Sequence, residues 1–193
     1  MAKFYDKLDD DIRSFIAEQQ LFFTATAPAQ GRINLSPKGI DTFRCLDEQT
    51  IAYLDLTGSG NESAAHLREN GRMTIMFCSF SDRPLILRLY GQGEVINSQH
   101  PEWETLLALF NDQPGQRQVI RLVLDSIQTS CGFGVPLFDF QGQRETLIEW
   151  ADKKGTKGLN QYRYKKNRTS IDGLPTGIII HDVEQLATQA NQE

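Results

Sequence analysis

The stretch RMTIMFCSFSDRPLILRLYGQGEVI, residues 72–96, decides the fold. Two runs rich in branched and aromatic residues, 72–80 and 85–96, flank the polar turn SDRP at 81–84. Strand-forming runs joined by a short turn pair as an antiparallel hairpin. The stretch therefore predicts an antiparallel sheet, because parallel neighbours would need a long crossover between them.

Five further runs have strand composition on either side of this hairpin: 21–27, 32–36, 41–47, 50–56 and 117–130. Apolar residues at helical spacing predict an N-terminal helix over 8–19. Short helices are expected after the fourth strand and at 101–111. Because so few helices separate the strands, the predicted fold class is mainly β, a closed or split antiparallel β-barrel with helical additions.

The composition changes from about residue 142, where charged, helix-forming residues dominate. Leu147, Trp150 and Ala151 form an apolar stripe, and Gly155 and Gly158 are expected to divide the segment into two helices. A separate unit of this size would be marginal on its own. We expect one domain over 1–193, with 142–193 as a helical C-terminal extension packed on the barrel or on a partner chain.

The composition also excludes several classes of protein. A net charge of -5 and a pI near 5.3 argue against a general nucleic-acid binder. No apolar run approaches the roughly 20 residues that span a bilayer, and no signal peptide is recognisable, so the predicted location is cytoplasmic. The cysteines and histidines show no metal-ligand spacing, and we expect no metal site. Cys45 and Cys78 are expected as small buried thiols.

DLTGSGNESAAHLREN, residues 55–70, combines a strand end, a glycine-serine loop and a short helix. One interpretation is a turn that only starts the helix, with Ser59 and Glu62 at capping-box spacing or Asn61 as the cap. The other is an anion site, in which unpaired amides and neutral donors hold the ligand. The G-K-[ST] ending of a P-loop is missing. We expect Glu62 to cap the helix.

GRINLSPKG, residues 31–39, alternates polar and apolar side chains. Its polar face is expected either as the exposed side of a half-buried strand or as a pocket lining. Pro37 interrupts the strand, so that Lys38 can turn inward. Arg88, in an otherwise apolar strand, points to solvent or supplies a cation to the loop. No nucleophile–base pair is recognisable, so any enzyme chemistry would come from a cofactor.

The ordered set RINLSPKG, the glycine-serine loop, AAHLREN, GRMTIMFCSF and RLYGQGEV resembles the pyridoxamine 5′-phosphate oxidase-like flavoproteins over residues 8–130. SCGFGVP and SIDGLP in the tail resemble an uncharacterised bacterial branch of that family. The resemblance implies a split β-barrel of the FMN-binding type and a homodimer with FMN at the subunit interface. The basic segment that grips phosphate in the family matches residues 61–64 here, which carry no cation. The C-terminal arginine–histidine motif of true oxidases has no counterpart.

The resemblance and the loop together define one set of candidate FMN-binding residues: Arg32, Asn34, Leu35, Ser36, Lys38, Ser59, Gly60, Asn61, Ser63 and Arg88. They assign no catalytic residue. The leading expectation is an FMN-dependent oxidoreductase that transfers hydride to or from an unknown small-molecule substrate. Two alternatives remain open: a non-catalytic dimer of the same fold that holds flavin or a haem-type ligand, and a structural dimer whose loop only caps a helix.

Overall fold

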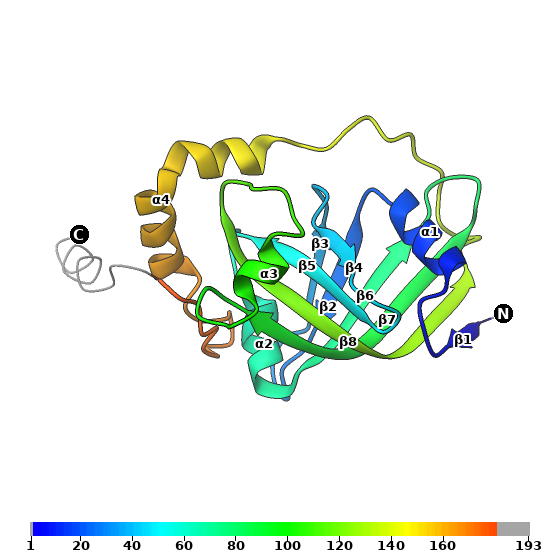
Figure 1. Cartoon of the computed structure of the whole chain (residues 1–193), viewed down its shortest axis with the longest axis horizontal. Helices are drawn as coiled ribbons and strands as arrows, with labels where there is room; N and C mark the ends of the chain where they lie inside the picture. The colour runs from blue at the N-terminus through cyan, green and yellow to red at the C-terminus, as the bar shows by residue number, and fades with distance from the viewer. Residues whose placement is uncertain (1, 181–193) are drawn as a thin grey trace.

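The computed structural model of the protein describes residues 2–180, as one curled eight-stranded sheet with helices around it (Figure 1). The strands are β1 Lys3–Tyr5, β2 Phe22–Thr26, β3 Asn34–Lys38, β4 Phe43–Cys45, β5 Thr50–Leu56, β6 Arg72–Cys78, β7 Leu85–Ile96 and β8 Gln116–Cys131. The helices are α1 Asp10–Glu18, α2 Glu62–Asn70, α3 Trp103–Leu107 and α4 Thr146–Lys166.

Every strand pair in the sheet is antiparallel, in the order β3-β2-β6-β7-β8-β5-β4, with β1 added beside β8. The curled sheet confirms the predicted split barrel with helical additions. β6 and β7 form the hairpin expected from residues 72–96. All seven predicted strands are present, but β1 was not predicted, because three residues are too few to show a pattern.

The register of β7 and β8 shifts between Tyr90 and Gly91. A Cβ atom on Gly91 would lie 2.0 Å from the carbonyl oxygen of Val123, so only glycine permits this close approach of the two strands. The close approach of β7 and β8 therefore explains why glycine stands at position 91, the first glycine of RLYGQG.

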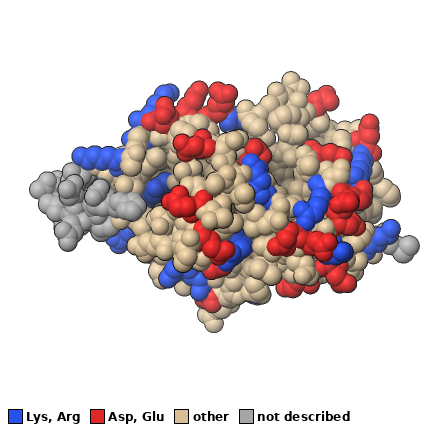
Figure 2. All heavy atoms as spheres, viewed as in Figure 1, with Lys and Arg blue, Asp and Glu red and all other residues tan. Residues whose placement is uncertain are grey.

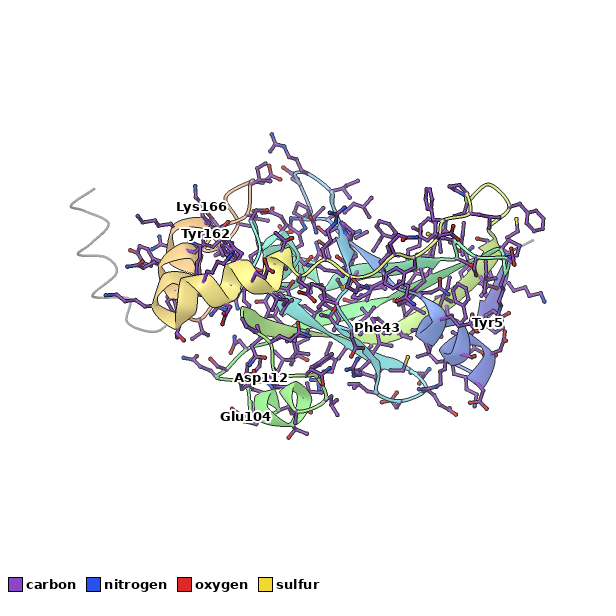
Figure 3. All side chains as sticks on the ribbon, turned by 90° about the horizontal axis from the view of Figure 1, so that it is seen from above. Tyr5, Phe43, Glu104, Asp112, Tyr162 and Lys166 are labelled. Carbon is purple, nitrogen blue, oxygen red and sulfur yellow. The ribbon has the colours of Figure 1, made fainter. Side chains whose placement is uncertain are left out.

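The barrel interior holds an aromatic cluster of Phe22, Phe43, Tyr53 and Phe77, whose ring centroids lie 5.0–5.6 Å apart. Edge-to-face contacts of this kind stabilise a core beyond the area they bury. Seen from above, Phe43 lies near the middle of the barrel, with Tyr5 toward one end and Tyr162 of α4 toward the other (Figure 3). Cys78 is buried as expected, and Cys45 is half-buried against the core.

The outer face of β3 differs from the expected half-buried strand. Ile33 and Leu35 are 77% and 65% exposed, whereas Asn34 and Ser36 lie on the more enclosed face. The default interpretation, in which the apolar residues are buried, is wrong. β3 is the last strand of the sheet, and Leu35 on its outer face is left exposed within residues 2–180.

From the end of β8 the chain runs back over the barrel, and α4 then turns down at the other end (Figure 1). α4 is broken at Gly155, whose backbone has φ 60° and ψ 176°, which confirms the two-helix prediction; Gly158 lies inside the second half. Ala151 is buried, and a Cβ atom on Gly115 would lie 2.9 Å from its own. Residues 181–193 of the predicted extension lie outside the described part of the chain.

Within residues 2–180, no helix is long and apolar enough to cross a membrane, and no group of side chains could ligate a metal ion. Acidic and basic side chains intermingle over the face shown in Figure 2. This mixture agrees with the acidic net charge of the sequence, which argues against a broad basic surface.

Candidate functional site

A polar cavity of about 210 Å³ lies where β3, the end of β5, the loop 57–61 and the start of α2 meet. We call it the loop cavity. Its polar lining side chains are Asn34, Ser36, Lys38, Asp55, Ser59, Asn61, Glu62, Ser63 and Arg117. Gly58 and Gly60 complete the wall, so the cavity contains the loop singled out in the sequence.

Strand β3 contributes one face of alternating residues to the loop cavity. The Asn34 amide Nδ2 donates to Ser63 Oγ at 3.2 Å, and the Ser36 hydroxyl donates to Asn34 Oδ1 at 3.0 Å. Lys38 Nζ lies 2.9 Å from Asp55 Oδ1. Because side chains of a strand alternate, residues 34, 36 and 38 reach the cavity together.

The floor of the loop cavity is a buried ion pair. Arg117 Nη2 lies 2.6 Å from Asp55 Oδ2, and the two side chains are 3% and 4% exposed. Gln118 Nε2 donates to the same carboxylate oxygen at 2.8 Å. Burial opposes ionisation of Asp55, but the charges of Arg117 and Lys38 outweigh it and hold the pKa of this carboxyl well below its usual range.

The end of α4 holds the loop in place. Asn167 Nδ2 donates to the carbonyl of Gly58 at 3.1 Å, and its Oδ1 accepts from Arg117 Nη1 at 3.0 Å. Arg163 donates to Thr57 Oγ1 at 2.9 Å. Burial, together with the nearby charge of Arg117, lowers the pKa of Arg163 to about 10. The C-terminal segment therefore positions the backbone of the candidate anion loop.

Asn61 presents an unused donor at the loop cavity. Its Oδ1 accepts from Gln118 Nε2 at 2.8 Å, but its buried Nδ2 has no hydrogen-bond partner in the described part of the chain. A buried donor without a partner costs about 1–3 kcal/mol, so a ligand that accepts this bond would recover stability. The charges around the cavity, Lys38 and Arg117 against Asp55 and Glu62, cancel. An anion here would depend on directed donors more than on net charge.

The expectation that Glu62 caps α2 is wrong. Its two carboxylate oxygens accept from the backbone N–H of Ile171, at 3.2 and 3.1 Å, and Asn61 makes no side-chain capping bond either. The reason is that the segment SIDGLP, residues 170–175, folds back onto the start of α2. Glu62 is thus occupied by the tail at the edge of the cavity.

Seven of the candidate FMN-binding residues line the loop cavity, and three do not. The seven are Asn34, Ser36, Lys38, Ser59, Gly60, Asn61 and Ser63. Of the other three, Arg32 is ion-paired with Asp172, Leu35 is exposed on the opposite face of β3, and Arg88 donates to Ser130 Oγ at 3.1 Å. The cation beside the loop is Arg117, not Arg88.

The sequence reasoning missed Asp55, Arg117 and Gln118. Each is a polar residue within an apolar strand, which was the available signal. The three residues lie close together because β5 pairs with β8, which places Asp55 opposite Gln118. These strands are about sixty residues apart in the chain, so no local pattern relates them.

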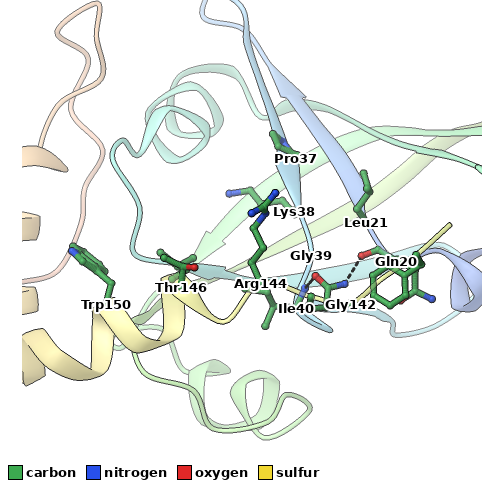
Figure 4. Close-up of a pocket in the computed structure, with 13 residues that line it drawn as sticks. Gln20, Leu21, Pro37, Lys38, Gly39, Ile40, Gly142, Arg144, Thr146 and Trp150 are labelled. Carbon is green, nitrogen blue, oxygen red and sulfur yellow. Dashed lines mark hydrogen bonds between the residues drawn. The ribbon is translucent and has the colours of Figure 1, made fainter. Parts of the chain in front are cut away.

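A second, larger cavity of about 680 Å³ adjoins the first through Lys38, which lines both. We call it the apolar cavity. It lies between the start of β2, the turn after β3 and the segment that leads into α4 (Figure 4). Its apolar side chains are Leu21, Pro37, Ile40, Phe140, Leu147 and Trp150.

A sequence model described as Pyridoxamine 5'-phosphate oxidase matches residues 8–131. The chain belongs to the pyridoxamine 5′-phosphate oxidase family. The match ends with β8, so α4 and the tail lie beyond the matched residues. A member from Aspergillus flavus, the pyridoxamine 5'-phosphate oxidase family protein ustO, is 41% identical over 91% of this chain and 78% of its own. This relative comes from a fungus, whereas the tail was expected to resemble a bacterial branch.

Solved structures of other proteins share the fold with the chain. HupZ of Group A Streptococcus superposes with a TM-score of 0.50 and 21% identity, covering 63% of this chain and 98% of its own. A Lactobacillus delbrueckii protein named after pyridoxamine 5'-phosphate oxidase gives a TM-score of 0.52 and 19% identity, covering 64% and 94%. These likenesses support the split barrel.

Proposed function

We propose that the protein binds FMN in a homodimer and acts as an oxidoreductase on a small molecule. The observation that carries the proposal is the unpartnered Nδ2 of Asn61, which lines a cavity beside Lys38 and Arg117. Family membership adds to it, because the resemblance noted in the sequence implies FMN. When bound, the flavin ring would accept or donate the hydride.

The residues of the loop cavity fit the phosphate end of FMN. At about 210 Å³ the cavity is smaller than the roughly 300–1,000 Å³ that hold a whole drug-sized ligand. It suits a phosphate and part of the chain attached to it. Asn61, Ser59 and Ser63 would donate to the phosphate oxygens, and a Cβ atom on Gly58 would meet nothing, so the backbone there is open to close approach.

The rest of the cofactor would extend past β3. Asn34 and Ser36 line the loop cavity on the same face of β3 as Lys38, where they can orient the polar edges of a flavin. Lys38 is held by Asp55, which fixes the position of its ammonium group. The chain thus supplies binding and orientation, in keeping with the division of labour in cofactor enzymes.

The exposed apolar face of β3 supports the homodimer. Leu35 lies on the edge strand β3 and Ile33 directly precedes that strand, next to the residues that line the loop cavity. Exposed apolar side chains on a sheet edge mark contact surfaces. A partner packed there would bring its own residues next to the cofactor, so we place FMN at the subunit interface. A cytoplasmic location stays a prediction from the sequence.

A haem-type ligand is less well supported than flavin. Haem iron needs a His, Cys, Met or Tyr ligand, and none of these residues lines the loop cavity or the apolar cavity. A loop that only caps a helix is also less well supported, since neither Glu62 nor Asn61 makes the capping bond. A flavin carrier without turnover remains the second candidate.

The absorbance spectrum of the purified full-length protein tests the cofactor, with release and identification of any bound ligand. We expect a flavin spectrum, or its appearance on titration with FMN, in the micromolar range. Protein that takes up no FMN at micromolar concentration would exclude the proposal. Reduction of the bound flavin by a nicotinamide nucleotide would then favour the enzyme over the carrier.

A further inference from the structure

One wall of the apolar cavity lies outside the residues matched by the family's sequence model. Phe140, Arg144, Leu147 and Trp150 come from the segment after β8, beyond the matched residues 8–131. At about 680 Å³ its volume lies within the range of small-molecule sites. The cavity is therefore large enough for a small molecule, and the segment after β8 helps to shape it.

The wall is fixed to the barrel by one glutamine. Gln143 Nε2 donates to the carbonyl of Gln20 at 2.8 Å, and its Oε1 accepts from the N–H of Ile40 at 3.3 Å (Figure 4). A Cβ atom on Gly39 would lie 2.8 Å from that Oε1, so a larger residue at position 39 would require the Gln143 side chain to shift. Ile40 and Asp41 have φ of 63° and 49°, a conformation that is rare for a β-branched residue and that bends the turn under the segment. The cavity is thus formed before a ligand arrives.

The chemistry of the lining is apolar and cationic. Two cations, Lys38 and Arg144, line the cavity, and no Asp or Glu does. Lys38 already pairs with Asp55, whereas Arg144 forms no hydrogen bond or ion pair with any residue between 2 and 180. In Figure 4 Arg144 extends from the segment toward Lys38. A planar guanidinium without a partner, beside apolar walls, matches a carboxylate on an apolar molecule.

Trp150 closes one end of the cavity. Its ring packs edge-to-face with Tyr162 at 5.0 Å, and Lys154 Nζ lies 5.3 Å from its centre. These contacts hold the indole in place, so that it can serve as a rigid apolar surface for a ring.

We propose that the apolar cavity binds an aromatic carboxylate, with Arg144 holding the carboxylate and Trp150 packing against the ring. This binding claim stands on the cavity alone. The further role of such a molecule as the substrate rests on the proposed function, because Lys38 lines both cavities and places the ligand next to the candidate FMN site.

Calorimetric titration of the full-length protein with 2-naphthoate tests the proposal, with the neutral 2-naphthalenemethanol as the matched ligand. We expect naphthoate to bind more tightly than the alcohol. Arg144→Gln should weaken the binding of naphthoate, but not of the alcohol, by about fivefold, as for a partly exposed charge contact. Arg144→Lys should retain part of the affinity. Trp150→Leu should weaken both ligands by the same factor.

Arg72 is the control, since it is exposed and has no ion pair between residues 2 and 180. It begins β6, beside the end of β2 that is farther from the cavity. Equal binding of the two ligands, or equal losses for Arg72→Gln and Arg144→Gln, would overturn the proposal. FMN is titrated in parallel. If FMN binds and naphthoate does not, the cavity proposal fails alone; if naphthoate binds and FMN does not, only the proposed function fails. Displacement of naphthoate by FMN would overturn the substrate role.

Discussion

The Arg117 guanidinium and the Asp55 carboxylate form an ion pair at 2.6 Å beneath the loop 57–61, and both side chains are almost fully buried. Arg117 also donates to the carbonyl of Gly60 and to Asn167. One pair thus connects β5, β8, the loop and the end of α4. We expect it to determine both the stability of this region and the shape of the loop cavity.

Replacement of Arg117 by leucine should lower the free energy of unfolding by about 3–5 kcal/mol, because it leaves Asp55 buried without its main counter-charge. Arg121, on the same strand, is the control: its pairs with Glu94 and Glu102 are partly exposed, so Arg121→Leu should cost at most about 1 kcal/mol. Urea unfolding measures both. Equal losses of unfolding free energy in the two variants would show that the buried pair stabilises the fold no more than an exposed pair does.

Acid should lower the free energy of unfolding, because Asp55 becomes protonated. The folded-state pKa of this carboxyl lies below its value in the unfolded chain, so the unfolded state binds its proton first as the pH falls. The stabilisation is fully present above about pH 4, the ordinary pKa of an aspartate, and is lost progressively below it. The advantage of the wild type over Asp55→Asn should therefore shrink progressively as the pH falls from 4 to 2. A difference in unfolding free energy that stays constant with pH would contradict this.

Gly91→Ala should destabilise the sheet by about 3 kcal/mol or more, because the new methyl group overlaps the Val123 carbonyl and the strands must separate. For a chain of this length, this corresponds to a fall in Tm of about 6–12 °C. Gly134→Ala is the matched control, since a Cβ atom there meets nothing within 4 Å and should leave Tm nearly unchanged. Thermal unfolding of both variants is the measurement, and a stable Gly91→Ala protein would argue against the register of β7 and β8.

Leu35→Glu should convert the proposed dimer to a monomer, because it places a charge on the exposed apolar face of β3. Val123→Glu is the control: Val123 is also a half-exposed apolar residue on a strand, but it lies on β8 in the middle of the sheet. Sedimentation velocity gives the mass of each. A wild-type monomer, or a Leu35→Glu dimer, would remove β3 from the interface.

The fold was predictable because its signals are local. The hairpin at 72–96, the amphipathic N-terminal helix and the change of composition near 142 each depend on residues close in the chain, and each appears in the structure. The break of α4 at Gly155 belongs to the same class. β1 was missed because its three residues are recognisable only through their pairing with β8.

The candidate site was predictable only in part. Alternation along β3 and the composition of the loop identified seven residues that line one cavity. Arg117 was missed, and Glu62 was misassigned, because their partners are distant in sequence: Asp55 on β5 for the first and Ile171 in the tail for the second. Arg88 was a wrong candidate for the cation for the same reason. A local sequence pattern does not show which strand faces the loop.

The central claim is that the loop cavity holds the phosphate of FMN, and Ser63→Asp tests it most directly. We measure dissociation constants of FMN and riboflavin for the wild type, for this variant and for Ser98→Asp, a control at an exposed serine between β7 and α3. Charge repulsion should weaken the binding of FMN to Ser63→Asp by at least about tenfold. The affinity for riboflavin, which lacks the phosphate, should be nearly unchanged. Equal losses for the two ligands, or an unchanged affinity for FMN, would contradict phosphate binding in this cavity.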